Sequence, residues 1–159
     1  MKCYQIHETQ KIPANIGEIW DFISSPANLK AITPEYMGFD ITSKLLTDRM
    51  YPGMIITYRI SPVPGIKMNW VTEITHVKEG EYFVDEQRIG PYALWHHEHK
   101  IEVIGGGVLM TDIVTYKPPF GLIGTIANAL FIRKQLRIIF DYRREAMEKL
   151  FGRMEPVLR

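Results

Sequence analysis

The stretch from Leu94 to Val103 alternates between apolar and polar residues in the way that is typical of a half-buried strand. In a strand, successive side chains point to opposite faces of the sheet. One face of this stretch would carry Trp95, His97, His99, Ile101 and Val103, and the other would carry Leu94, His96, Glu98, Lys100 and Glu102. The second set is largely charged, so we expect it to face water. Two histidines and a tryptophan are therefore predicted to face the core.

Strand patterns occur on both sides of this stretch, and turn residues separate them. The predicted strands are residues 4–12, 36–43, 54–60, 67–77, 82–88, 94–103 and 108–116. Gly105-Gly106-Gly107 lies between two of these strands and not before a helix, so we interpret it as a hairpin turn and not as a phosphate loop. Because short turns join the later strands, we expect an antiparallel meander.

Helix signals follow the first strand and close the sequence. Asn15 and Glu18 have the spacing of a capping box, and they precede an apolar helical face over residues 16–23. A second short helix is predicted over residues 26–32. Residues 125–151 contain no Gly or Pro and predict a long helix. Its apolar face would carry Ile132, Leu136, Ile139, Phe140, Met147, Leu150 and Phe151.

The whole chain has the size and composition of one globular domain. It has 159 residues, of which 46% are hydrophobic and 23% are charged. We expect a single domain over residues 1–159, with residues 152–159 as a frayed tail. Cys3 is the only cysteine in the sequence, which favours a cytoplasmic location. The formal net charge of +1 gives no electrostatic case for nucleic-acid binding, and no apolar run approaches the ~18 residues of a transmembrane segment.

Several pieces of the sequence carry a resemblance to a known superfamily. They are Trp20-Asp21-Phe22-Ile23 within residues 16–32; Phe83-Val84-Asp85-Glu86-Gln87 with Gly90-Pro91-Tyr92 and Trp95-His96-His97-Glu98-His99; Met110-Thr111-Asp112 through Tyr116 with Pro119-Phe120-Gly121; and Phe131-Ile132-Arg133 through Phe140-Asp141-Tyr142-Arg143. In these pieces the chain resembles the START and birch-pollen-allergen-like superfamily, also called SRPBCC. Within it, the chain is similar to a bacterial branch of polyketide cyclase/dehydrase-like or ligand-binding proteins, some of them named as cell-division inhibitors.

The resemblance implies an α+β helix-grip fold. In this fold a seven-stranded, curved antiparallel sheet surrounds a long C-terminal helix, and two short helices follow strand 1. A cavity between the sheet and the long helix would bind a small hydrophobic or amphipathic molecule, such as a lipid, a quinone or a polyketide-like compound. We expect this binding to occur without catalysis and without a cofactor. Two alternatives stay open: a cyclase or dehydrase that uses His97 and Asp112, and a partner-binding regulatory module.

Alternation along the strands, together with the long helix, predicts which side chains face this cavity. The candidate ligand-binding residues are Tyr58, Trp70, Phe83, Asp85, Gln87, Trp95, His97, His99, Met110, Asp112, Tyr116 and Arg143. A one-residue shift in register would turn any of these strand faces over.

His97 and His99 allow three interpretations. A His-x-His pair on a strand could bind a metal with Asp112 as a third ligand, although no further His or Cys stands at a recognisable spacing, so we expect no metal. His97 held by Asp112 could instead transfer a proton to or from a bound carbonyl compound. In the third interpretation, which we favour, the two histidines, Asp85 and Asp112 satisfy one another in a buried polar seam.

Two further features of the sequence lead to specific expectations. Arg143 falls within the apolar arc of the long helix, where a charge is costly unless it is paired. We predict that it reaches Asp85 or Asp112 and ties helix to sheet. Two alternatives stay open: it could pair with the acidic head group of a bound ligand, or it could run its methylene stem along the edge of the core and place its charge in water. The loop over residues 118–124 carries Phe120, Leu122 and Ile123. This loop could form a lid, make a weak contact with a membrane or a protein, or pack on the core.

Overall fold

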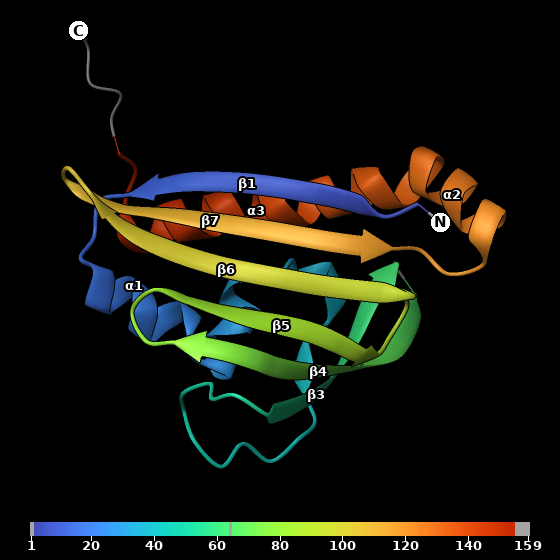
Figure 1. Ribbon diagram of the computed structural model, residues 1–159, viewed down its shortest axis with the longest axis horizontal. Helices are drawn as coiled ribbons and strands as arrows, with labels where there is room; N and C mark the ends of the chain where they lie inside the picture. The colour runs from blue at the N-terminus through green and yellow to red at the C-terminus, as the bar shows by residue number, and fades with distance from the viewer. Residues whose placement is uncertain (1, 64, 155–159) are drawn as a thin grey trace, which may run out of the picture.

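The computed structural model describes residues 2–63 and 65–154 as seven strands and a set of helical segments (Figure 1). In chain order these are β1 (Tyr4–Ile12), α1 (Ile16–Ile23), η1 (Pro26–Ile32), η2 (Glu35–Met37), β2 (Asp40–Ile41), β3 (Met54–Val63), β4 (Ile66–Lys78), β5 (Tyr82–Ile89), β6 (Leu94–Ile104), β7 (Gly107–Lys117), α2 (Gly121–Ala127), η3 (Asn128–Ile132) and α3 (Arg133–Phe151). A frayed tail was predicted over residues 152–159, and the part of it after Met154 lies outside the described residues.

The strands form one antiparallel sheet in the order β1-β7-β6-β5-β4-β3-β2. Strands β2 to β7 follow one another as a meander, whereas β1 lies next to β7, the last strand of the chain. In that pairing Tyr4 lies opposite Tyr116 and Ile12 lies opposite Val108. β2 contributes only two pairs to the other edge of the sheet. The predicted seven-stranded antiparallel sheet is confirmed.

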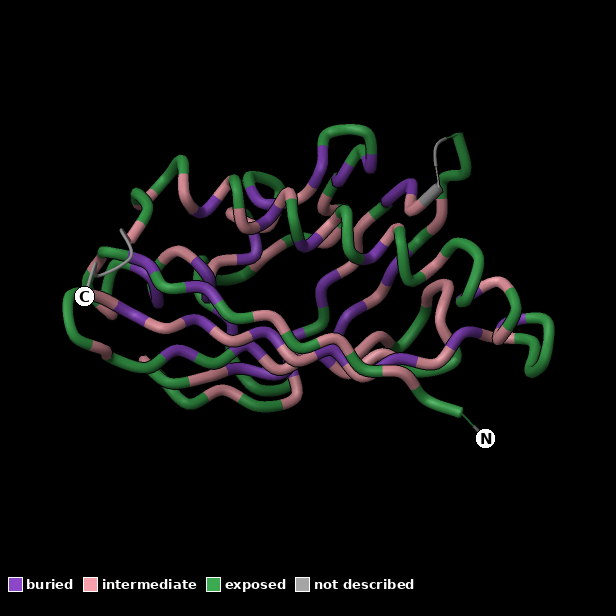
Figure 2. Tube along the Cα trace, turned by 90° about the horizontal axis from the view of Figure 1, so that it is seen from above, coloured by how far each residue is buried: buried purple, intermediate pink, exposed green. Residues whose placement is uncertain are grey.

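The helices form a second layer on one face of the sheet (Figure 2). α3 runs along this face behind β1 and β7, and α1 lies near one end of the sheet (Figure 1). The predicted capping box begins α1: Asn15 accepts a hydrogen bond from the Glu18 backbone N–H at 2.9 Å, and the Glu18 carboxylate accepts one from the Asn15 backbone N–H. The cap satisfies two of the backbone N–H groups that have no intrahelical partner at the start of α1.

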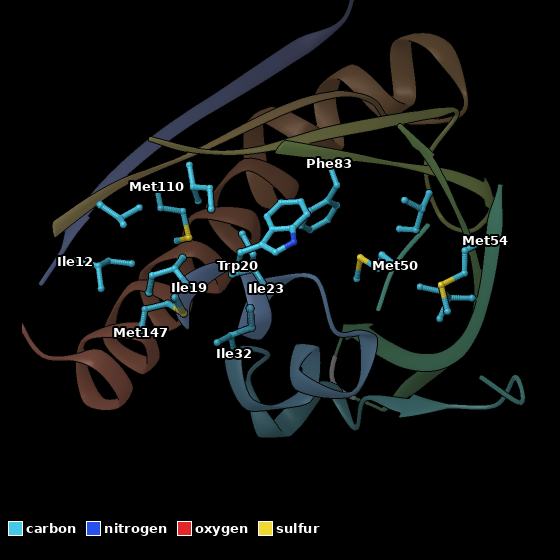
Figure 3. Close-up of a cluster of buried hydrophobic side chains, with 14 residues drawn as sticks. Ile12, Ile19, Trp20, Ile23, Ile32, Met50, Met54, Phe83, Met110 and Met147 are labelled. Atoms are coloured by element: carbon cyan, nitrogen blue, oxygen red, sulfur yellow. The ribbon is translucent and has the colours of Figure 1, made fainter. Parts of the chain in front are cut away.

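Packed apolar side chains fill much of the space between the two layers (Figure 3). Ile12, Ile19, Met110 and Met147 are almost fully buried there. Trp20 meets Phe83 edge to face, with 6.3 Å between ring centroids. This cluster closes the space at the C-terminal half of α3.

Two predicted elements differ from the structure. The strand predicted over residues 36–43 is confined to Asp40–Ile41, because Glu35–Met37 forms a helical turn that ends at Gly38 in the left-handed region (φ 54°). A chain that turns there cannot run as a continuous strand, although Met37 and Phe39 are still buried.

The long helix also begins earlier than predicted. α2 begins at Gly121 after Phe120, which adopts the left-handed conformation (φ 63°), and a π-helical turn, η3, joins it to α3. The predicted loop 118–124 is therefore short and largely helical. Leu150, predicted on the apolar face, is 51% exposed. It is the penultimate residue of α3, whereas Leu136, Phe140 and Met147, which were predicted on the same face, are buried.

Candidate functional site

A cavity of about 150 Å³ lies between the sheet and the N-terminal half of α3. It is walled by β3, β4, β5 and β6, by residues around η1 and η2, and by α3. Among the predicted site residues, Tyr58, Trp70, Phe83, Asp85, Trp95, His97, His99 and Arg143 line it.

Four predicted site residues do not line the cavity: Gln87, Met110, Asp112 and Tyr116. The Gln87 side chain makes two hydrogen bonds with the backbone of Tyr92, at 2.7 and 3.2 Å, and so holds the β5–β6 turn. Met110 belongs to the packed core. The Tyr116 hydroxyl donates to Asn128 Oδ1 at 2.8 Å. Asp112 is buried behind the histidines and does not line the cavity.

Aromatic rings form one wall of the cavity. Tyr58 and Trp70 are stacked, with 6.1 Å between centroids, and Trp70 meets Trp95 edge to face at 5.4 Å. Phe39 and Tyr92 extend this group at 4.8 Å from Tyr58 and 4.9 Å from Trp95. Flat apolar surfaces at these angles suit a planar or compact apolar molecule.

Sequence reasoning missed Phe39 because the strand predicted over residues 36–43 was assigned no inward face, and it missed Tyr92 because that residue follows a turn, where alternation gives no face. The same applies to Leu29 and Thr33, in and just after a short helical turn. Ile139, which was predicted only as part of the apolar helix face, also lines the cavity. The pattern in Gly90-Pro91-Tyr92 marks a turn, and an aromatic residue directly after a turn was the available signal.

Beside the aromatic rings lies a buried group of charged side chains, which we call the His–Asp cluster: Asp85, His97, His99, Asp112 and Arg143. Strand register assembles most of it, because Asp85 on β5 lies opposite His97 on β6, and His99 on β6 lies opposite Asp112 on β7. Alternation then points all four side chains to the helix side of the sheet. The predicted inward direction of His97, His99 and Asp112 is confirmed, since they are no more than 5% exposed, whereas Val103, predicted on the same face of β6, is 69% exposed near the end of that strand.

Each imidazole of the cluster lies between the same two carboxylates. His99 Nε2 is 2.8 Å from Asp85 Oδ2, and its Nδ1 is 2.9 Å from Asp112 Oδ1. His97 Nε2 is 3.0 Å from Asp112 Oδ1, and its Nδ1 is 3.5 Å from Asp85 Oδ2. The two rings lie 3.7 Å apart between centroids. His99 therefore makes two short contacts to carboxylates, whereas His97 makes only one.

Arg143 reaches this cluster from α3, as the sequence predicted. Its Nη2 lies 3.5 Å from Asp112 Oδ1 and 3.2 Å from His99 Nδ1. The residue is 9% exposed. The guanidinium thus ties the helix to β6 and β7 at the base of the cavity.

Opposing effects determine the charges of the cluster. Burial raises the pKa of Asp112, but the Arg143 guanidinium and hydrogen bonds from both histidines outweigh it and hold that pKa well below its usual range. Burial likewise raises the pKa of Asp85, but the hydrogen bond from His99 and the neighbouring positive charges lower it. For His99 burial lowers the pKa, and the hydrogen bonds to Asp112 and Asp85 reverse this, so the pKa is raised.

His97 behaves differently. Burial lowers its pKa, the neighbouring His99 lowers it further, and the hydrogen bond to Asp112 compensates only in part. The cluster thus combines two carboxylates whose pKa is lowered, the Arg143 guanidinium, a His99 that favours its charged form and a His97 that favours its neutral form. Its charges are balanced inside the fold, which makes burial of this many ionisable groups tolerable.

Two buried N–H groups at the cavity have no hydrogen-bond partner among the described residues. They are Trp70 Nε1 and Arg143 Nε. Both residues line the cavity. Unsatisfied buried donors are rare because each one costs free energy, and they are often explained by a water or a ligand.

Asp85, His97 and His99 are the described residues that could hold a metal ion, with one donor atom from each lying within 4.8 Å of the others. The sequence interpretation had put Asp112 in the place that Asp85 takes here. No helix in the described part of the chain is long and apolar enough to cross a membrane.

Solved structures with this fold exist, although no protein-family model and no curated protein matches the sequence. Protein CV1439 from Chromobacterium violaceum matches 94% of this chain and 99% of its own with a TM-score of 0.69 and 12% identity. Ginseng major latex-like protein 151 from Panax ginseng matches 94% and 97% with a TM-score of 0.65 and 10% identity. Ara h 8.0201 matches 93% and 99% with a TM-score of 0.62 and 12% identity.

These similarities define the class of fold. The chain has the helix-grip fold of birch-pollen-allergen-like proteins, and the fold implied by the sequence resemblance is confirmed. At identities of 10–12% the likeness establishes fold and not function.

Proposed function

We propose that this protein binds a small apolar or amphipathic molecule in the cavity between sheet and α3. The observation that carries the proposal is the pair of unpartnered buried donors, Trp70 Nε1 and Arg143 Nε, at a cavity whose walls are mostly aromatic and aliphatic apart from the charged side of Asp85, His97 and His99. A ligand with an apolar body and an acceptor oxygen could pack against the aromatic rings and also accept a hydrogen bond from one of these N–H groups. Among lipids, quinones and polyketide-like compounds, this chemistry favours a ring system with a carbonyl group.

The volume of the cavity limits the size of the ligand. About 150 Å³ is smaller than the roughly 300–1,000 Å³ of pockets for drug-sized ligands. It is similar to an engineered cavity that binds benzene. The ligand is therefore compact, or only its head enters. A whole lipid chain does not fit unless it extends out of the cavity.

The test compares two probes of nearly equal shape, naphthalene and 1,4-naphthoquinone. Native mass spectrometry of protein purified without added ligand comes first, and calorimetry with the probes follows. We expect the quinone to bind about tenfold more tightly, and Trp70→Phe, which keeps a ring but removes the N–H, to abolish the difference. Ile89→Ala, at an exposed apolar site away from the cavity, is the control. If neither probe binds the wild-type protein, the proposal is wrong.

A second candidate is an enzyme of the cyclase or dehydrase type in the bacterial branch that the sequence resembles. The observation that favours it is the neutral His97, which lines the cavity and is held by Asp112 at 3.0 Å. Such an imidazole can accept a proton from a carbonyl compound. His97→Gln should then abolish turnover of a cyclisable polyketide-like ketone while naphthoquinone still binds. Unchanged turnover in His97→Gln would exclude this role.

We also propose that residues 118–124 and the helix that follows contact an anionic membrane surface. Phe120, Leu122, Ile123 and Leu130 are 81%, 76%, 72% and 78% exposed, far more than isolated surface residues explain. The sequence has no acidic residue between Asp112 and Asp141, whereas this interval contains basic residues at 117, 133, 134 and 137. An apolar surface with a basic border fits the cytoplasmic face of an anionic bilayer, which agrees with the location that the single Cys3 favours.

Sedimentation with vesicles tests this contact. We expect binding to phosphatidylglycerol vesicles, little binding to phosphatidylcholine, and loss of binding in Leu122→Glu. Val103→Glu changes an equally exposed apolar residue (69%) in β6 and should bind like the wild type. A protein that ignores vesicles but forms a dimer or captures a second protein through Leu122 would instead support the partner-binding alternative.

A further inference from the structure

Donor atoms of Asp85, His97 and His99 converge on one point of the cavity wall. Asp85 Oδ2 lies 2.8 Å from His99 Nε2 and 3.5 Å from His97 Nδ1. One donor atom from each of the three residues lies within 4.8 Å of the others. We infer that these three side chains bind a divalent transition-metal ion of the zinc type. The inference does not rest on the proposed cavity ligand.

The ligand set and its spacing match such an ion. Two imidazoles and one carboxylate form a set found in catalytic zinc sites. Around an ion about 2.1 Å from each ligand, tetrahedral geometry places neighbouring ligand atoms about 3.4 Å apart. The two separations that involve Asp85, 2.8 and 3.5 Å, lie on either side of this value or near it, and the two imidazole nitrogens lie within 4.8 Å of each other.

The other nitrogen of each imidazole supports the same assignment. His97 Nε2 and His99 Nδ1 both lie on Asp112 Oδ1, at 3.0 and 2.9 Å. A carboxylate behind the ligating imidazole fixes its tautomer and its orientation and makes it a better donor. Here one buried carboxylate does this for both rings, and Arg143 lies against that carboxylate. Asp112 is thus a positioning residue and not a ligand.

Exposure to the cavity gives the site an open coordination position. Asp85, His97 and His99 line the cavity, whereas Asp112 does not. A metal ion held there would have protein ligands on the sheet side and a free position on the cavity side. It could accept an oxygen atom of a molecule in the cavity and polarise it.

Charge is compatible with occupancy. Asp85 and Asp112 supply two negative charges, and Arg143 supplies one positive charge. With both imidazoles neutral, a divalent ion leaves the group at +1, so the two carboxylates compensate most of the added charge. Arg143 lowers the affinity for the ion, but it contacts Asp112 and His99 and not Asp85.

Metal titration of the purified, chelator-treated chain tests the inference. We expect one equivalent of Zn²⁺ by calorimetry, a raised Tm, and Co²⁺ visible absorption that excess Zn²⁺ abolishes. Asp85→Asn and His99→Gln should each weaken binding at least tenfold. His96→Gln is the matched control, because His96 is on the same strand but pairs with Glu86 on the outer face. A wild-type chain that binds no stoichiometric Zn²⁺, or an equal loss in His96→Gln, overturns the inference.

Asp112 has its own readout. Asp112→Asn should weaken Zn²⁺ about 10- to 100-fold and shift the Co²⁺ spectrum, and Asp112→Glu should restore part of the affinity. If a ligand variant does not fold, the Co²⁺ spectrum of the wild-type chain still decides, because nitrogen ligation in a low-coordinate site gives intense bands and surface binding does not.

Discussion

Arg143 carries a permanent charge into the apolar interface between α3 and the sheet. Its guanidinium lies 3.5 Å from Asp112, which has no other cation of fixed charge beside it among the described residues. The neighbouring residue on the same helix, Arg144, pairs with Glu8 at 3.1 Å, where both side chains are about 40% exposed. The two arginines therefore make a buried and an exposed ion pair one residue apart.

Replacing Arg143 with methionine should cost roughly 3–5 kcal/mol of unfolding free energy, because the Asp112 carboxylate is left buried without its cation. Arg144→Met should cost about 1 kcal/mol or less. Urea denaturation at pH 7 measures both changes. Equal losses in the two variants would mean that Arg143 only extends its stem along the core edge.

His99 makes the stability of the metal-free protein depend on pH. Its pKa in the fold lies above the ordinary 6.5 because of Asp112 and Asp85, against the effect of burial. The stabilisation is therefore complete below about pH 6.5 and is lost as the pH rises through the folded pKa. The groups facing His99 are Asp85, His97, Asp112 and Arg143, and none of them contributes a second charge change in that direction.

The difference in unfolding free energy between wild type and His99→Gln should then shrink from pH 6 to pH 9. Chelator is kept in the buffer throughout, and His96→Gln is the control. A difference that stays constant or grows with pH contradicts the charged state of His99.

At the scale of single residues, alternation predicted that His97, His99 and Asp112 point inward. In β6 the charged residues on the alternate positions must face water, so the histidines face the core. It could not predict the position of Gln87. Gln87 is on the predicted face, but its amide finds the Tyr92 backbone, a contact that depends on how the following turn closes. The partners of Asp85 were open for the same reason, because strand pairing and not the local sequence decides them.

The C-terminal helical segment consists of two α-helices joined by a π turn. Asn128 begins that turn, is 2% exposed, and accepts a hydrogen bond from the Tyr116 hydroxyl on β7. The turn therefore fixes where the helix leaves the sheet. The sequence predicts helix through this region but gives no signal for an extra residue in one turn, because all its residues are compatible with an α-helix.

Asn128→Ala should lower the unfolding free energy by about 1–3 kcal/mol, because the Tyr116 hydroxyl loses its partner in a site that is 1% exposed. Thr125→Ala, which removes an exposed hydroxyl bonded to Gly121 one turn earlier, should change it by less than about 0.5 kcal/mol. Thermal or urea unfolding followed by circular dichroism measures both variants. An Asn128→Ala protein as stable as Thr125→Ala would show that this bond does not fix the turn.

Among the other elements, the sequence predicted best those with strong periodicity or an explicit cap. The capping box of α1 and the alternation of β7 are local features and are present as expected. The strand predicted over residues 36–43 was mostly wrong, because the apolar residues there lie in a helical turn and a loop. Buried apolar residues in such segments give the same sequence pattern as a strand.

At the scale of the whole molecule, the space between sheet and helix is divided into a packed part and a hollow part. α3 contributes to both, with Met147 in the packed core and Ile139 at the cavity. The residue before Ile139, Ile138, is 44% exposed and does not line the cavity. Placing the same large side chain at each position in turn therefore distinguishes the effect of filling the cavity from the effect of adding exposed surface.

Ile139→Trp should reduce naphthoquinone binding at least tenfold while changing the unfolding free energy by roughly 1–3 kcal/mol or less. Ile138→Trp should bind like the wild type. Calorimetry with the same probe measures both proteins. If Ile139→Trp still binds the probe fully, the ligand occupies another place.

The pairing of β1 with β7 has a consequence for how the chain reaches its fold. Tyr4 lies opposite Tyr116 on the neighbouring strand, so β1 can pair only after β7, the last strand of the sheet, has been synthesised. Strands β3 to β7 can pair one after another because short turns join them. Pairing of β1 with β7 instead closes a loop that contains most of the chain, which costs conformational entropy. We therefore expect β1 docking to be the slow step of folding, and a nascent chain released before β7 to expose an unpaired sheet edge that invites aggregation.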